Sequence, residues 1–324
     1  MCDPCFGIAN TRGAPGFIAC VSLCILSIGC IISYQDLNHT LTILHIYNDI
    51  RKSTIRYPLN AKHNKQFASR TGFLLKYVMN QMFWISTIAV FVIYIYGTYT
   101  TLSMDNINIR TELLIFWSIV LVIFCQQVFG VLWWGIVLRY GSTLYLKYKF
   151  NEVNEKIAKI TENPKMFDSF SLLIIMREHS YIETITKHFN HNLRGAIFAL
   201  YYIGTPGFQI ALYGTHHKDI HFYARIFALF ITVTCFVAII YVNLMSTWVS
   251  KAAHKSYSVI NSYICHRKER MSLLHRMKIL SFIEHLSGPE IGFYCYDLFP
   301  MNNYEFYQYL YICGSNYFLI MSFF

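Results

Sequence analysis

The chain has 324 residues, of which 55% are hydrophobic, 17% aromatic and only 14% charged, and its mean hydropathy is +0.37. This composition excludes a soluble globular domain and predicts a polytopic membrane protein. The net charge of +10 does not indicate nucleic-acid binding, because the cations alternate with apolar runs along the chain.

Six charge-free apolar runs follow one another, each near the ~20 residues that a helix needs to cross a bilayer. In order they are Gly16–Ser33, Tyr77–Tyr99, Leu113–Leu138, Gly195–Gly214, Ile226–Val249 and Phe306–Phe324. The sequence therefore predicts an all-α fold, a membrane helical bundle with six spans in this chain.

Lysine and arginine set the predicted orientation of the spans. Of the 27 cations, 23 fall in the segments 34–76, 139–194 and 250–305. Loops shorter than ~60 residues follow the positive-inside rule. We therefore expect both chain ends outside the cell, two basic cytoplasmic loops within residues 1–249, a third within 250–305, and a terminal helix over 306–324.

The basic loops carry helical patterns rather than linker composition. Val153, Ile157 and Ile160 recur at helical spacing, and a second helix is expected after Pro164, with Leu172, Ile175 and Met176 on its apolar side. In the third loop, Leu273, Met277 and Leu280 form a similar stripe. These patterns predict cytoplasmic extensions that pack as a bundle, or amphipathic helices that lie on the anionic inner leaflet.

The fourth predicted span is interrupted at its centre by Gly204-Thr205-Pro206-Gly207. Proline removes a backbone hydrogen bond and kinks a helix, and glycine loosens it further. Because such a break is tolerated in a membrane only beside protein or water, this span is expected to face the bundle or a cavity.

Aromatic residues gather in the predicted outer halves of spans two to five, where they favour either a pocket for small apolar molecules or interfacial belts and core packing. They are Tyr94, Tyr96, Tyr99, Phe116, Trp117, Phe208, Tyr213, Phe227 and Phe230.

Histidine pairs give little support to a metal site. His188 and His191 are three residues apart, and His217 and His221 are four apart beside His216, so either pair fits a helix face. The fourth predicted span separates the two groups, and we expect no metal or other cofactor.

The chain shows no nucleophile arrangement or phosphate loop, so no enzyme is predicted. A coupled transporter is disfavoured because the spans contain no ionisable group.

The terminal run FYQYLYICGSNYFLIMSFF is charge-free, and its centre holds polar residues together with Gly314 and Ser315. Small residues let another backbone approach closely. This pattern favours a helix that packs against copies of itself or lines a wet path, with a lipid-facing helix as the alternative.

The end of the chain resembles the terminal motif of arthropod gustatory receptors, in which Thr-Tyr, five mostly hydrophobic residues and Gln-Phe follow one another. Tyr317 and Phe324 match at the right separation, while Asn316 replaces the threonine and Phe323 the glutamine. The segment Ser287–Phe299 is similar to the one that leads into the family's last helix. The family's large internal loops also match the basic segments. The family has seven spans, so the six predicted here lead us to expect that the first is missing from this chain.

The resemblance implies a chemosensory, ligand-gated, non-selective cation channel in the plasma membrane. It also implies a homo- or hetero-tetramer embedded in lipid, opened by a small-molecule tastant, with the cytoplasmic helices as an anchor between subunits. Each last helix would line the pore, with Leu310 and Gly314 at the constriction and Tyr317 and Met321 continuing the stripe. A G-protein-coupled receptor with its C-terminus inside, or a membrane enzyme or transporter, is the alternative.

Overall fold

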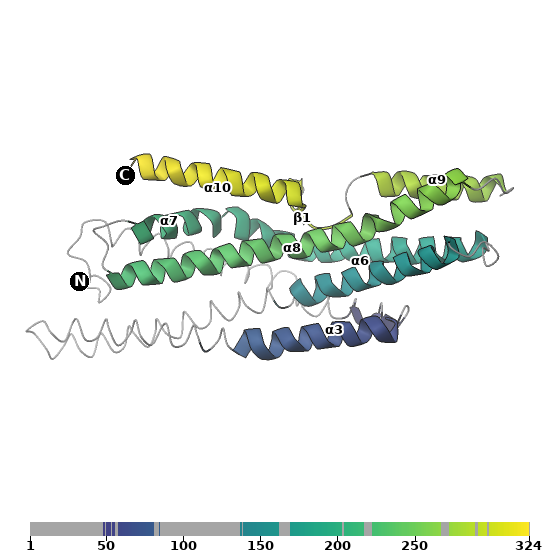
Figure 1. Ribbon diagram of the computed structural model, residues 1–324, viewed down its shortest axis with the longest axis horizontal. Coiled ribbons are helices and arrows are strands. Elements are labelled where there is room, and N and C mark those ends of the chain that lie inside the picture. The colour runs from purple at the N-terminus through teal and green to yellow at the C-terminus, as the bar shows by residue number, and fades with distance from the viewer. Residues whose placement is uncertain are drawn as a thin grey trace, which may run out of the picture.

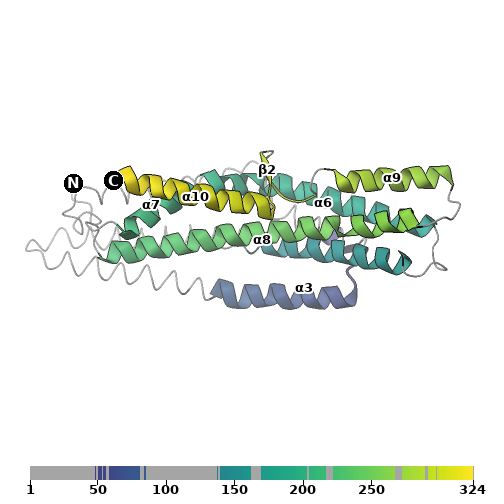
Figure 2. The ribbon, with the colours of Figure 1, turned by 45° about the horizontal axis from the view of Figure 1, so that its top comes forward.

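A computed structural model describes residues 58–80, 139–161, 169–202, 204–216, 222–266, 272–288, 291–296 and 298–323, with positions 48, 50–52, 54, 55, 84 and 137 (Figure 1). This part of the chain is mostly helical, and its helices run along the long axis of an elongated bundle (Figures 1 and 2). The predicted first span, the third up to residue 136, and most of the second lie outside the described residues.

The second and third basic segments form helices where the sequence predicts them, and the first segment, for which no helix was predicted, is helical as well. In the first segment, α3 (Ala61–Phe73) continues into a π-helical turn, η1 (Leu74–Met79). Residues 139–161 of the second segment form one helix. The third basic segment contains α9 (Leu273–Ser287).

The long helical stretch after residue 168 divides at the predicted break. α6 (Ser169–Tyr202) ends just before the Gly204-Thr205-Pro206-Gly207 sequence, and α7 (Gly204–His216) begins with it. Pro206 therefore lies in the first turn of α7, where a helix does not need the backbone N–H that proline lacks. The two helices remain in contact across the break.

α8 (Phe222–His266), with 45 residues, is the longest helix among the described residues. At 1.5 Å per residue it extends ~67 Å, about twice the hydrocarbon thickness of a bilayer. The predicted span Ile226–Val249 therefore continues as one helix into the basic segment that follows it, as expected. Its first half packs against α7, and its second half packs against α9.

Two helical stretches among the described residues are long and apolar enough to cross a membrane, Phe170–His216 and Cys235–Ser262. They overlap the fourth and fifth predicted spans. The terminal helix α10 (Asn303–Phe323) is not one of the two. Its tyrosines and its amide and hydroxyl side chains make it less apolar than a typical lipid-facing span.

The segment before α10 contains a small β-hairpin, which the all-α expectation did not include. β1 (Tyr294–Cys295) pairs antiparallel with β2 (Phe299–Pro300), with Cys295 opposite Phe299. Tyr296 at the turn has φ = 53°, in the left-handed region that non-glycine residues seldom adopt. Its ring packs against Phe198 and beneath the guanidinium of Arg194, which holds the turn in place.

The core lies between the helix of residues 139–161, α6, the second half of α8, and α9. Val153, Ile157, Leu172, Ile175 and Met176 are all buried, as the helical spacing predicts. Residues four apart on one helix lie on the same face one turn apart, so each helix presents a continuous apolar side to its neighbours. The described parts of the basic segments 139–194 and 250–305 thus pack together as a helical bundle, hereafter the basic bundle.

The stripe predicted for α9 is on the wrong side of the helix for this core. Leu273, Met277 and Leu280 are 75%, 61% and 47% exposed, whereas Ile279 and Phe282 are buried. The helix is apolar on two sides, so hydrophobic spacing alone did not distinguish the side that packs within this chain from the side left open.

Candidate functional site

The terminal helix α10 has two distinct faces. It lies beside α7 and the first half of α8 (Figure 2). Cys313, on the inner face, is only 7% exposed, and Tyr309 packs beside it. The outer face bears exposed residues at helical spacing, among them Gln308, Tyr311 and Ser315. From residue 306 to 323 the helix carries no charge, and one of its sides is left uncovered by the described part of the chain.

The residues predicted to form the gate lie at the edge between these faces. Leu310, Gly314 and Tyr317 are half-buried, and Met321 belongs to the same stripe, although its side chain is not described. A Cβ added at Gly314 would meet nothing within 4 Å in the described structure. The space beside this glycine is therefore open to solvent, lipid or another copy of the chain.

α10 is joined to the break between α6 and α7 through side chains. The hydroxyls of Thr205 and Tyr309 lie 2.6 Å apart in a hydrogen bond. The ring of Tyr201, at the end of α6, stands edge-on to Tyr309 with 4.8 Å between centroids, and it also contacts Phe299 of the hairpin. The sequence predicted the break but not its contact with the terminal helix, because no spacing rule links residues that are 104 positions apart.

The family-motif residues fall on different sides of α10. Asn316 is exposed, whereas Tyr317 is half-buried with its ring 6.2 Å from that of His216 at the end of α7. The side chains of Phe323 and Phe324 lie outside the described residues.

A buried arginine ties α10's leading segment to the bundle. Arg139 donates a hydrogen bond of 2.8 Å to Ser246 Oγ on α8 and a longer one of 3.5 Å to Met301 Sδ, just before α10. Its guanidinium also lies 5.0 Å from the centre of the Phe293 ring. From the sequence, Arg139 was only one of the cations of the second basic segment. Its position directly after the predicted span Leu113–Leu138 was the one sequence feature that set it apart from the other cations.

The hairpin side of this junction is closely packed. A Cβ on Gly292 would lie 3.3 Å from Cβ of Ser250, so glycine allows the segment to approach α8. Cys295 is fully buried, and burial raises the pKa of its thiol to about 11 despite the opposing charge of Arg139. The thiol is therefore protonated at neutral pH and unreactive.

Only part of the predicted ligand pocket can be placed. Phe208 of α7 stacks on Phe236 of α8 with 5.9 Å between centroids, and Tyr213 is half-buried on α7. Phe227 and Phe230 lie on α8, but their side chains are not described. Tyr94, Tyr96, Tyr99, Phe116 and Trp117 lie outside the described residues, so the enclosure of a pocket is untested.

The predicted histidine pairs do not assemble in the described part of the chain. His188 and His191 are exposed on α6, His216 ends α7, and His217 and His221 are not described. The described residues hold no group of three or more His, Cys, Asp or Glu that could bind a metal ion.

No protein-family model and no curated protein matches the sequence. The structure, however, is similar to the olfactory receptor OR5 of the insect Machilis hrabei. Over 99% of this chain and 85% of the receptor in complex with eugenol, the TM-score is 0.74 at 10% sequence identity. For the same receptor without that ligand, the TM-score is 0.69 at 11% sequence identity, over 98% of this chain and 84% of the receptor. The chain therefore has the fold of an insect olfactory receptor.

Proposed function

We propose that this chain is a subunit of a chemosensory, ligand-gated cation channel in the plasma membrane, opened from the extracellular side by a small molecule. The observation that carries the proposal is the uncovered outer face of α10, which bears polar side chains on a helix free of charge over residues 306–323. A water-filled path needs such a face, whereas a lipid-facing helix does not. The receptor-like fold supports the same assignment.

The pore would form where copies of α10 meet around an axis, in a homo- or hetero-tetramer as the terminal resemblance implies. A second exposed apolar surface supports assembly at the other end of the molecule. This surface is the α9 stripe, defined as Leu273, Leu274, Met277 and Leu280. Exposed apolar stripes of this kind mark contacts with other proteins or with membranes.

Two neighbouring stripes of α10 compete for the constriction. Leu310 and Gly314, implied by the resemblance, are half-buried, whereas Tyr311 and Ser315 are exposed about a quarter-turn away. A pore between subunits lies outside each subunit, so burial favours the exposed stripe. The half-buried stripe remains our proposal for the part of the helix that rotates or shifts during opening.

The ligand is proposed to be a small, mainly apolar molecule, as a taste or odour substance would be. The related receptor has been captured with eugenol, a small aromatic phenol. In this chain, the stacked Phe208 and Phe236 give α7 and α8 an aromatic contact in the predicted outer half of the bundle. A ligand there would open the channel only by binding the open state more tightly.

Cysteine accessibility in patch-clamp recordings tests the proposal and separates the two stripes. Ser315→Cys places a thiol on the exposed stripe and Leu310→Cys on the half-buried one, with buried Cys313 of the unmodified chain as the background control. A membrane-impermeant thiol reagent is expected to block current through Ser315→Cys strongly and through Leu310→Cys weakly.

Three other outcomes would each change a different part of the proposal. Stronger block at Leu310→Cys would return the constriction to the stripe implied by the resemblance. The absence of any current from cells that display the protein at their surface, under a broad panel of small volatile and soluble molecules, would contradict the channel. An internal C-terminus, detected by a tag that antibody cannot reach on intact cells, would favour the G-protein-coupled alternative.

A further inference from the structure

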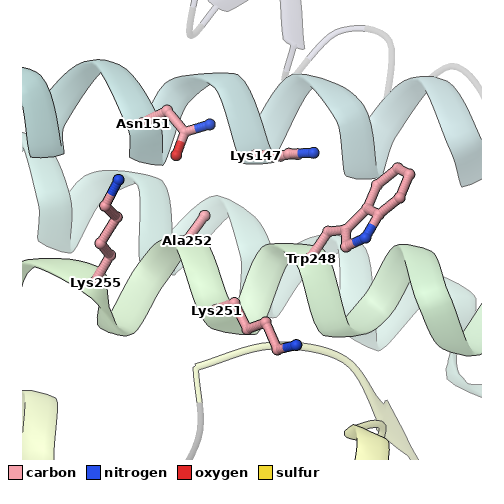
Figure 3. Close-up of a pocket in the computed structure, with 6 residues that line it drawn as sticks. All are labelled: Lys147, Asn151, Trp248, Lys251, Ala252 and Lys255. Atoms are coloured by element: carbon pink, nitrogen blue, oxygen red, sulfur yellow. The ribbon is translucent and has the colours of Figure 1, made fainter.

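A shallow cavity of about 190 Å³, largely open to the surface, lies between the helix of residues 139–161 and the second half of α8 (Figure 3). It is lined by three lysines, an indole, an amide and a small apolar residue, namely Lys147, Asn151, Trp248, Lys251, Ala252 and Lys255. None of these lining residues carries a carboxylate. The cavity belongs neither to α10 nor to the predicted ligand pocket.

Helical spacing explains how the lining residues meet. Lys147 and Asn151 are four residues apart on one helix, and Trp248, Lys251 and Lys255 follow an i, i+3, i+7 pattern on α8. The small side chain of Ala252 lets the helices approach. Figure 3 shows Lys147, Trp248 and Lys255 around the space between the helices, with Lys251 extending along the outer side of α8.

Charge at the cavity is positive and comes from more than one helix. Nζ of Lys147 lies 4.1 Å from the centre of the Trp248 ring. Burial and, to a lesser degree, the charge of Arg70 on α3 lower the pKa of Lys147 from its usual 10.5. A bound anion would relieve this repulsion and would be attracted by every cation around the cavity.

Nearby lysines on the same helix have a different environment. Lys149 lies 3.6 Å from a carboxylate oxygen of Glu152, and Lys156 lies 2.9 Å from one of Glu178. These pairs neutralise charge inside the basic bundle. The lysines of the cavity instead gather beside an indole and an amide, so this is the place where an external anion would complete the charge balance.

The position of the cavity along the helices suits the inner surface of a membrane. Lys251 and Lys255 follow directly after the predicted span Ile226–Val249, and Lys147 lies in the third turn after the predicted span Leu113–Leu138. Tryptophan is enriched where a membrane meets water, and Trp248 occurs at that depth. Basic pockets at this level between spanning helices suit phosphorylated lipid headgroups.

We propose that this cavity binds an anion bearing phosphate groups, with Lys147 and Lys255 as its principal cations, Lys251 at its rim and the Asn151 amide as a further donor. Lysine ammonium groups bind phosphate as point charges, and several phosphates on one ligand would engage several lysines together. The phosphates come either from an inner-leaflet phosphoinositide or from a soluble phosphate ester. The inference concerns binding and does not depend on channel activity.

Two probes distinguish these sources in the purified full chain. Inositol hexakisphosphate is titrated calorimetrically, and retention of phosphatidylinositol bisphosphate from phosphatidylcholine nanodiscs is measured by native mass spectrometry. The site variant is Lys147→Gln with Lys255→Gln. Its charge-matched control is Lys65→Gln with Lys278→Gln, both exposed and outside the cavity lining. Size-exclusion chromatography of both variants, compared with wild type, is the check that they are folded.

The site variant is expected to bind about 25-fold more weakly than wild type, at about fivefold for each lysine, while the control variant binds like wild type. Loss of retained lipid in the site variant alone would support the inference with a lipid source. Loss of hexakisphosphate binding, without lipid retention in any form, would support it with a soluble source. Equal binding by the site and control variants, or no binding of either probe, would overturn it.

Discussion

At the scale of single residues, Arg139 shows how a buried cation can join parts of the chain without a carboxylate. It is only 5% exposed and is held by Ser246 Oγ, Met301 Sδ and the face of Phe293. A planar guanidinium can reach several such groups together, whereas a lysine ammonium is a single point on a flexible chain. The segment before α10 is thereby fixed to α8 and to the start of the helix of residues 139–161.

Arg139→Lys is expected to lower the free energy of unfolding by about 1–3 kcal/mol, because hydrogen bonds from a charged donor are lost in a buried site. Thermal unfolding of the purified protein measures this change. Arg177→Lys, at an exposed position on α6, is the matched control and should leave stability within about 0.5 kcal/mol of wild type. Equal stability of the two variants would contradict the role assigned to Arg139.

His179 is a second buried residue whose charge matters. Its ring lies between Phe150 and Phe282, and Nε2 is 3.1 Å from the carbonyl oxygen of Ala253. Burial lowers the pKa of His179 from 6.5, although the hydrogen bond to Ala253 acts in the opposite direction. The unfolded chain therefore takes up a proton at a higher pH than the folded chain does. The resulting stability is complete above about pH 6.5 and is lost as the pH falls below it toward the folded pKa.

We expect acidification from pH 7.5 to about pH 5.5 to lower the unfolding temperature less in His179→Phe than in wild type, since the variant has no ring to protonate. Glu183, His254 and His285 also carry titratable groups near this ring, so the difference between the two proteins is the relevant quantity. The exposed His188→Gln variant should keep the wild-type pH dependence. Parallel pH profiles for wild type and His179→Phe would refute the assignment.

At the scale of elements, the break between α6 and α7 contacts the terminal helix α10. Pro206 and its neighbouring glycines end one helix and start the next, and Thr205 then reaches Tyr309 of α10. A movement of α7 relative to α8 would therefore be felt at the base of α10. We propose that this contact couples the aromatic contact of Phe208 and Phe236 to the proposed pore.

Thr205→Val and Tyr309→Phe each remove one hydroxyl and keep the shape of the side chain. Each is expected to lower the free energy of unfolding by about 0.5–1.5 kcal/mol. The double variant should differ little from either single variant, because both substitutions remove the same hydrogen bond. Thermal unfolding of wild type, the two single variants and the double variant provides a double-mutant cycle. Concentration–response curves of the same proteins show whether their ligand sensitivity changes too. Tyr307→Phe, on the exposed face of α10, serves as the control. Fully additive effects would show that the two hydroxyls act separately.

At the scale of the whole molecule, the two ends of the bundle leave different surfaces open. α9 and the outer end of α10 lie at opposite ends of the long axis (Figure 1). The α9 stripe is apolar and exposed, and α10 presents a mixed polar and aromatic face. If subunits assemble through the first surface and enclose a pore with the second, assembly and conduction can be disrupted separately.

Leu273→Gln combined with Met277→Gln should weaken assembly without unfolding the subunit, because both side chains are largely exposed within one chain. Light scattering of the purified protein is expected to show smaller particles, while helix content measured by circular dichroism stays unchanged. Ile174→Gln, an exposed apolar position on α6, is the control and should assemble normally. Unchanged particle size with weaker binding to anionic vesicles would instead place the α9 stripe on the inner leaflet.

Sequence alone was enough to predict the membrane class, the basic segments, the helices around Val153 and Leu172, and the break before Pro206. These features depend on composition, local spacing and backbone chemistry, which a chain carries wherever it folds. It also predicted the terminal helix. The number of six spans and the placement of both chain ends outside the cell remain predictions.

Only the tertiary structure decided which side of each helix is covered. It left Leu273 exposed although the spacing of α9 favoured it for the core, placed Leu310 at a half-buried edge, and brought Lys147 and Lys255 to one cavity. It also placed Thr205 beside Tyr309. Periodicity describes one helix at a time, whereas covering, clustering and pairing depend on how distant helices are arranged against one another, which no local pattern specifies.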